Sequence, residues 1–265
     1  MTDASILGLF AHPDDEVLAA GGVLARHAAA GARTAVVTAT WAPDSHRAEE
    51  LAHALRILGA AEPRMLGYAD HQVPDSAPEQ PRLCDAPLDE AVGRVVEHMR
   101  AFRPDIVITH DPSGASGHPD HVRTHQITVL AVHASGLPDL HPHAGPAWTP
   151  RSLWLAAYPQ VGARDLADLL ATVGKRLRTV PDEMVTSPVD VRPWISQKQE
   201  ALFAHRSEVA RARSLPALLS GLPDSSRADL LSTEWFMCHD LTPSQVPPQH
   251  VPDPLHLHPG TGCEA

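Results

Sequence analysis

Short apolar runs rich in β-branched residues alternate with longer segments of helical periodicity through the first half of this chain. The apolar runs predict strands over residues 5–11, 33–40, 63–66 and 105–109. The periodic segments predict helices over residues 16–30, 46–58, 87–102 and 119–134. Further along, residues 152–158 predict a strand and residues 195–213 a long helix. Because strands that alternate with helices form mostly parallel sheets covered on both faces, the pattern predicts an α/β fold of three layers.

The length of the chain favours a single domain. Its 265 residues suit one sizeable α/β domain, with or without a small appendage, and 43% of them are hydrophobic, which is enough for a core. The segment after residue 240 is rich in proline and histidine, a composition typical of irregular structure. We therefore expect one domain over residues 1–240 and an irregular tail over residues 241–265.

Charge and cysteine content restrict the partners and the location of the protein. Its formal net charge is −11, whereas nucleic acids and anionic membranes select proteins with a basic face. The three cysteines are far apart and indicate neither a disulfide framework nor a cysteine-rich metal site. No segment has the pattern of a signal peptide or of a transmembrane helix. We expect a soluble cytoplasmic protein without nucleic-acid or membrane partners, and a homo-oligomer is compatible with the sequence.

Two short runs combine histidine with carboxylates at the ends of predicted strands. AHPDDE occupies residues 11–16, and GHPDH occupies residues 117–121. Parallel α/β sheets bind ligands at the carboxyl ends of their strands, where the strand order reverses. If the two strands are neighbours, the runs form one crevice with the ligands of a mononuclear zinc hydrolase. The alternative is that the three acids only cap the following helix and that the second run is a histidine-rich turn.

A catalytic zinc ion needs three protein ligands and an open position for water. His12 and Asp15 are three residues apart across a strand-to-helix turn and can point into the same space. His121 would supply the third ligand from the other wall of the crevice. The spacing alone leaves open which of the two aspartates binds the metal.

The remaining residues of the two runs suit acid/base chemistry. Bound zinc lowers the pKa of a water molecule to about 7, and Asp14 is the natural base for its proton. His118 would stabilise the oxyanion and protonate the leaving amine, with Asp120 orienting its imidazole. The pair Gly21-Gly22 lacks the pattern of a dinucleotide-binding loop, and we expect it to allow close helix packing.

Both runs resemble the motifs of the PIG-L/LmbE family of zinc-dependent N-deacetylases, and the chain is most similar to the mycothiol-pathway branch of actinobacteria. Further similar segments are residues 111–125, 198–205 and 234–236, so the resemblance covers roughly residues 5–240. It implies a Rossmann-like fold and one zinc ion per chain, although the same ligand types also accept iron or cobalt. It also implies that His12, Asp15 and His121 are the ligands, that Asp14 is the base and that His118 serves the oxyanion or acts as the acid.

Substrate contacts follow from the resemblance less directly. Arg47 resembles a substrate-contacting arginine, and Asp75 resembles a carboxylate that holds sugar hydroxyls; the alternatives are a helix-cap arginine and a loop turn. The mycothiol branch carries a tyrosine two residues before the histidine of the second run, where this chain has Ser116. We count Ser116 among the expected substrate contacts. The departure weakens the expectation that this chain shares the substrate of the mycothiol branch, but it does not weaken the expectation that it shares the reaction.

The sequence thus predicts a hydrolase that removes an acetyl group from an N-acetylglucosamine-type aminosugar conjugate in antibiotic or thiol biosynthesis. One alternative is an amidase that cleaves a larger acyl group from a thiol or antibiotic conjugate. Another is a metal- or sugar-binding protein without turnover. The sequence also leaves open whether Asp14 or His118 protonates the leaving amine.

Overall fold

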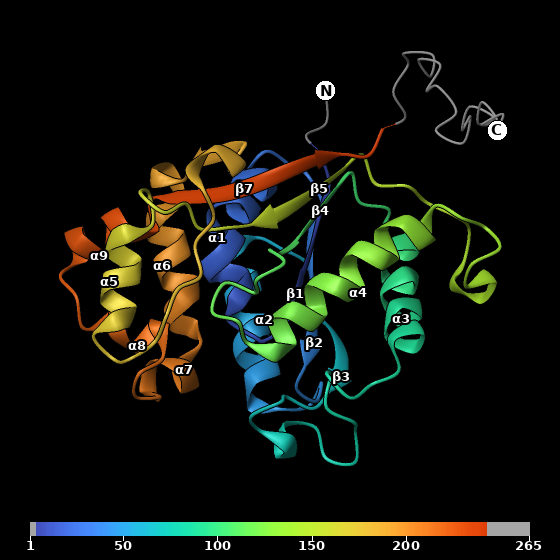
Figure 1. Cartoon of the computed structure of the whole chain (residues 1–265), viewed down its shortest axis with the longest axis horizontal. Helices are drawn as coiled ribbons and strands as arrows, with labels where there is room; N and C mark the ends of the chain where they lie inside the picture. Colours follow the sequence, from blue (N-terminus) through green and yellow to red (C-terminus); the bar gives the residue numbers. More distant parts are fainter. Residues whose placement is uncertain (1–3, 243–265) are drawn as a thin grey trace, which may run out of the picture.

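One sheet of seven strands lies at the centre of the computed structural model, which describes residues 4–242 (Figure 1). Its strands are β1 (Ile6–Phe10), β2 (Thr34–Thr40), β3 (Arg64–Tyr68), β4 (Ile106–His110), β5 (Ser152–Ala156), β6 (Ser187–Asp190) and β7 (Thr233–Asp240). They are ordered β3-β2-β1-β4-β5-β7-β6. The first five in this order pair in parallel, whereas β7 runs antiparallel to both β5 and β6. The predicted, mostly parallel α/β sheet is confirmed.

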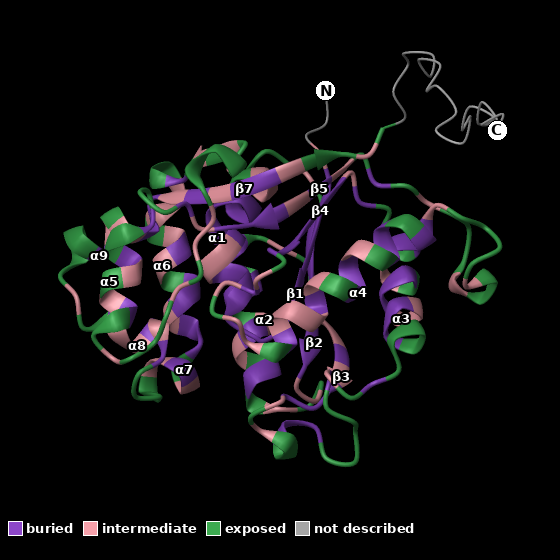
Figure 2. Ribbon diagram, viewed as in Figure 1, coloured by how far each residue is buried: buried purple, intermediate pink, exposed green. Residues whose placement is uncertain are grey.

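Helices cover both faces of the sheet and make three layers (Figures 1 and 2). Successive side chains of β1 point to opposite faces, so that Leu7 and Leu9 enter one core while Ile6 and Phe10 enter the other. The first core is covered by α3 (Leu88–Phe102) and α4 (Pro119–Ser135). The second is covered by α1 (Asp15–Ala29), α2 (His46–Leu58) and α6 (Ile195–Ala204).

Short helices gather beside α6 at one side of the molecule (Figure 1). They are α5 (Arg164–Ala171), α7 (Arg206–Ala210), α8 (Leu215–Ser220) and α9 (Asp224–Leu231). No helix within residues 4–242 is both long enough and apolar enough to cross a bilayer.

The predicted single helix over residues 195–213 is wrong. The chain leaves helical geometry at His205, where ψ is 66°, and this residue separates α6 from α7. The His205 side chain contacts Glu16 instead, with Nε2 2.8 Å from Oε1. A tertiary contact with another helix therefore ends the helical run.

The sequence pattern also failed to reveal the antiparallel part of the sheet. The second residue of β7 is the buried Glu234, and a buried acid interrupts the apolar pattern by which a strand is recognised. The expected domain limit at residue 240 coincides with the end of β7. Of the expected tail over residues 241–265, residues 243–265 lie outside the described residues, so the division stays a prediction.

The strand order reverses between β1 and β4. These strands are parallel neighbours, with Ile6 opposite Ile106. β1 leads into α1 on one face of the sheet, and β4 leads into α4 on the other. The carboxyl ends of β1 and β4 consequently border the crevice in which parallel α/β sheets bind their ligands.

Candidate functional site

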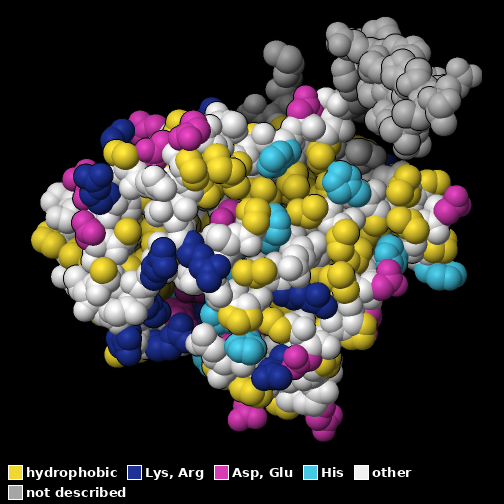
Figure 3. Space-filling view, viewed as in Figure 1, with side chains coloured by type: hydrophobic (Ala, Val, Ile, Leu, Met, Phe, Trp, Pro, Cys, Tyr) yellow, Lys and Arg dark blue, Asp and Glu magenta, His cyan; other side chains and the backbone are white. Residues whose placement is uncertain are grey.

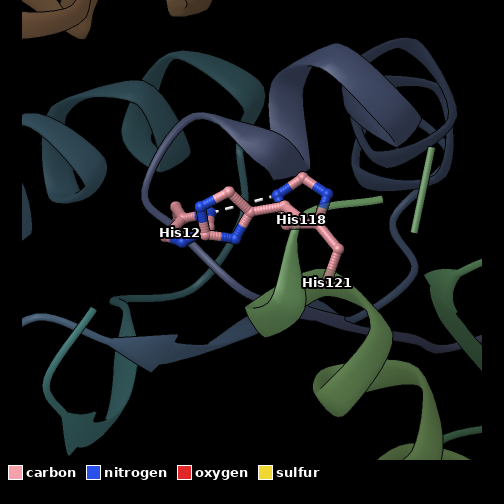
Figure 4. A group of neighbouring side chains, drawn as sticks. All are labelled: His12, His118 and His121. Carbon is pink, nitrogen blue, oxygen red and sulfur yellow. Dashed lines mark hydrogen bonds between the residues drawn. The ribbon is translucent and has the colours of Figure 1, made fainter. Parts of the chain in front are cut away.

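The two histidine-containing runs meet at this crevice. The first forms the turn between β1 and α1, and the second begins α4 after the loop that follows β4. In Figure 4, His12 faces His118 and His121, which project from the start of α4. The strands β1 and β4 are therefore neighbours, which the sequence alone could not establish.

Three donor atoms converge between the runs. His12 Nδ1 lies 3.1 Å from His121 Nε2 and 3.3 Å from Asp15 Oδ2, and the latter two atoms are 3.4 Å apart. Donors held tetrahedrally at about 2.0–2.1 Å from a zinc ion lie roughly 3.3 Å from one another. The spacing of the three atoms therefore fits a zinc ion.

The contacts of the far ring nitrogens support the same conclusion. His12 Nε2 faces the carboxylates of Asp70 at 3.1 Å and Asp120 at 3.3 Å, and His121 Nδ1 lies 3.2 Å from the Gly114 carbonyl oxygen. These acceptors favour protons on the far nitrogens, so that unprotonated nitrogens face the Asp15 oxygen. Three electron-rich atoms so close together need a cation between them, and such outer partners are typical of metal-binding histidines.

Asp14 is held in a strained conformation beside this group. Its φ of 125° is unfavourable for a residue with a side chain and costs of the order of 1–3 kcal/mol. Its backbone N–H donates to Glu16 Oε2 at 2.9 Å, and the other oxygen of Glu16 contacts His205. Burial raises the pKa of Asp14 to about 7, against the opposing charge of Arg47. A buried carboxyl group with such a pKa suits a general base at neutral pH.

Arg47 of α2 lies behind the base. Its guanidinium group is buried, contacts the Pro13 carbonyl oxygen and lies 3.1 Å from Asp14 Oδ1. On its other side it pairs with Glu208 at 3.0 Å, and it lies over the Trp41 ring. Arg47 also lines the cavity described below. It can therefore position Asp14 and contact a ligand in the cavity.

His118 occupies the N-cap position of α4. Its Nδ1 accepts the backbone N–H of Asp120 at 3.2 Å, which leaves Nε2–H as a donor. Burial lowers the pKa of His118, so the ring is neutral at neutral pH. The Asp120 carboxylate is 3.8 Å from Nδ1, too far for a hydrogen bond, and it contacts His12 instead. Asp120 thus orients a different histidine from the one that the sequence indicated.

Two further residues of the site were missed by sequence reasoning. His110, the last residue of β4, stacks on the His121 ring with centroids 4.1 Å apart, and its Nε2 lies 3.5 Å from Asp15 Oδ2. Asp70 follows β3 by two residues and contacts His12. Both lie at or just after the carboxyl end of a parallel strand, and this position is the sequence signal that could have indicated them.

The predicted substrate contacts are placed differently from one another. Ser116 lines the cavity from the loop before α4. Asp75 is exposed in the short turn Pro74–Ser76 and is not among the described residues that line the cavity, whereas Asp70 is.

A cavity of about 470 Å³ opens over these groups. His12, Asp14, Asp15, His118 and His121 form its inner part, and leucines from α5 and α8 contribute an apolar wall. The fold and the site thus define a Rossmann-like α/β protein with a metal-binding group, a buried carboxyl group and a neutral histidine at the switch point of its sheet.

Comparison with known sequences agrees with this class. The family model PIG-L, described as GlcNAc-PI de-N-acetylase, matches residues 7–132. A 1D-myo-inositol 2-acetamido-2-deoxy-alpha-D-glucopyranoside deacetylase of Rhodococcus erythropolis is 37% identical over 79% of this chain and 82% of its own. A protein of the same name from Streptomyces scabiei is 31% identical over 87% and 83% of the two chains. The chain belongs to the PIG-L family.

Solved structures share the fold. N,N'-diacetylchitobiose deacetylase from Pyrococcus horikoshii superposes with a TM-score of 0.62 and 20% identity over 92% of this chain and 88% of its own. The A40926 pseudoaglycone deacetylase gives a TM-score of 0.55 and 22% identity over 90% and 98% of the two chains.

Proposed function

We propose that this protein is a metal-dependent N-deacetylase that hydrolyses the acetamide of an N-acetylglucosamine-type conjugate. The observation that carries the proposal is the convergence of His12, Asp15 and His121 beside Asp14 in one cavity. The deacetylases of the inositol glycoside support the reaction, since they share more than 30% of their residues with this chain.

We assign His12, Asp15 and His121 as the ligands of one Zn²⁺. When bound, the ion would polarise the amide carbonyl and acidify a water molecule. Asp14, held by Arg47, accepts the proton of the attacking water. The Nε2–H of the neutral His118 donates to the developing oxyanion, and Asp14 then passes the proton taken from the water to the leaving amine.

Asp70 and Ser116 are our candidates for binding sugar hydroxyl groups. Both line the cavity, and the buried Asp70 lies beside His12, with Oδ2 3.1 Å from Nε2. The apolar wall of the cavity favours a second candidate, an amidase for larger acyl groups. A series of N-acyl glucosamines of increasing chain length distinguishes the two, because a deacetylase loses turnover as the acyl group grows.

The test compares wild-type protein, purified without a histidine tag, with the variant His12→Ala. Metal content is measured by elemental analysis, and free amine is measured after incubation with N-acetylglucosamine conjugates, including the inositol glycoside. We expect about one metal ion per wild-type chain and loss of both metal and amine release in the variant. His133→Ala, on an exposed part of α4, is the matched control. Wild-type protein that binds no zinc, or that binds it and releases no amine, overturns the proposal.

A further inference from the structure

Cations gather at the mouth of the cavity although the chain as a whole is acidic. Figure 3 shows Lys and Arg side chains around a hollow on this face. Lys175, Arg176 and Arg211 are exposed and line the cavity. Arg211 pairs with Glu208 at 2.9 Å, whereas Lys175 and Arg176 have no carboxylate oxygen within 4.0 Å in the part of the chain that the structure describes. The chain has a net charge of −11, so two neighbouring cations without a carboxylate partner at the mouth of the cavity indicate a binding site for an anionic ligand.

The backbone that carries these cations is fixed. We call residues 173–178 the rim segment. At its start, the Arg213 guanidinium group donates to the Val173 carbonyl oxygen at 2.6 Å. At its end, the Arg178 N–H donates to the Ala115 carbonyl oxygen at 2.5 Å, which ties the rim segment to the loop before His118. The side chains of Lys175 and Arg176 are thus presented from a pre-organised backbone, which lowers the entropic cost of binding a ligand.

The charges of the cavity are separated between its two ends. The inner end carries Asp14, Asp15 and Asp70 with the proposed metal, and the mouth carries the unpaired cations. Burial lowers the pKa of Lys175, and the charges of Arg211 and Arg213 also lower it because the cations repel one another, whereas the carboxylates of Glu208 and Asp14 raise it. An anion between them would relieve this repulsion. A neutral inositol glycoside, the compound in the names of the relatives, can accept hydrogen bonds from these cations but carries no charge to offset theirs.

We propose that Lys175 and Arg176 bind an anionic group, a phosphate or a carboxylate, on the part of the substrate that lies away from the acetamide. The substrate is then an N-acetylglucosamine conjugate that is bound at both ends, by the metal-centred site inside and by the rim segment outside. This inference rests on the proposed function. It restricts the substrate class to anionic conjugates.

The test compares a neutral substrate, methyl N-acetylglucosaminide, with two anionic ones, N-acetylglucosamine 1-phosphate and a carboxylated N-acetylglucosaminide. We expect wild-type protein to favour at least one anionic substrate by about tenfold or more in kcat/KM. The double variant Lys175→Gln/Arg176→Gln should lose that preference and keep its activity on the neutral substrate. Both positions are exposed, so the variant is expected to fold. Arg164→Gln, an exposed arginine of α5 outside the cavity lining, is the control for charge alone.

Binding provides a readout that does not need turnover. Calorimetry on Asp14→Asn protein measures the dissociation constants of the same three compounds. We expect tighter binding of the phosphate or the carboxylate compound, lost in the rim variant and weakened as salt rises from about 50 mM to about 500 mM. Which anionic compound binds more tightly identifies the anionic group. Equal binding of neutral and anionic compounds, or a preference that survives the rim variant, overturns the inference, whereas absence of amine release alone contradicts only the proposed function.

Discussion

Asp14 adopts a backbone conformation that few aspartates tolerate, and its neighbours hold it there. Glu16 accepts its N–H, and Arg47 contacts its carboxylate. Asp14→Asn keeps the shape of the side chain but removes the base. We expect metal content to be unchanged and turnover to fall by roughly 10²–10⁴-fold. Metal analysis and amine release on the same preparation check this, with the exposed Asp44→Asn as control. Near-normal turnover in Asp14→Asn would remove the residue from the role of base.

Glu16 supports Asp14 from the interior. It is fully buried, and its two oxygens contact the Asp14 N–H and His205 Nε2. Glu16→Ala leaves both partners buried without an acceptor, so the free energy of unfolding should fall by about 2–4 kcal/mol. Urea denaturation of the variant and of Glu49→Ala, an exposed position of α2, measures the difference. Equal losses in the two variants would show that the buried contacts of Glu16 contribute nothing.

The proposed ligands could be named from the sequence because they belong to two contiguous runs in which histidine and carboxylates are concentrated. Spacing alone did not decide between Asp14 and Asp15, and the resemblance decided it. His110, Asp70 and Lys175 could not be found in this way. Each lies outside the two runs, and only the packing of distant segments brings it to the cavity.

At the scale of elements, one buried carboxylate joins α1, α6 and β7. Glu234 accepts the N–H groups of Gly22 and Val23 at 2.7 and 2.9 Å and lies 2.7 Å from Lys198 Nζ. The absence of a side chain at Gly22 permits the close approach of Val191 beside this contact, because a Cβ at Gly22 would overlap the Val191 side chain. Since α1 begins at Asp15, this junction also fixes the position of a proposed metal ligand.

Replacing Glu234 should lower the free energy of unfolding more than replacing its partner Lys198. Glu234→Ala leaves a buried ammonium group and two N–H groups without their acceptor, and we expect a loss of about 3–5 kcal/mol of unfolding free energy. Lys198→Met should cost less, because Glu234 keeps both backbone donors. Denaturant unfolding of the metal-free proteins measures both. A larger loss for Lys198→Met would contradict this account of the junction.

Elements with their own periodicity were predicted well. The parallel βα units of the first half each carry an apolar strand followed by a helix with one apolar face. The second half depends on tertiary contacts. Its strand β7 contains the buried Glu234, and the break between α6 and α7 follows from the contact of His205 with Glu16. Neither contact has a local signal.

At the scale of the whole molecule, the proposed metal ligands come from both sides of the sheet. His12 and Asp15 lie at the start of α1 on one face, and His121 lies in α4 on the other. A metal ion at the switch point would therefore link the two outer layers through the carboxyl ends of β1 and β4. Metal binding and folding of the whole domain should be coupled for this reason.

The coupling predicts a dependence of thermal stability on metal. A ligand at about 1,000 times its Kd stabilises the folded state by about 4 kcal/mol, which raises the Tm of a domain of this size by roughly 10 °C. Calorimetric scans of chelated protein, before and after addition of Zn²⁺, measure the shift. His12→Ala should show no such shift, and His133→Ala should show the full one. The shift should also shrink at lower pH, because protons compete with the metal for the imidazole nitrogens. An unchanged Tm for wild-type protein after zinc addition would mean that the two layers are not joined through a metal.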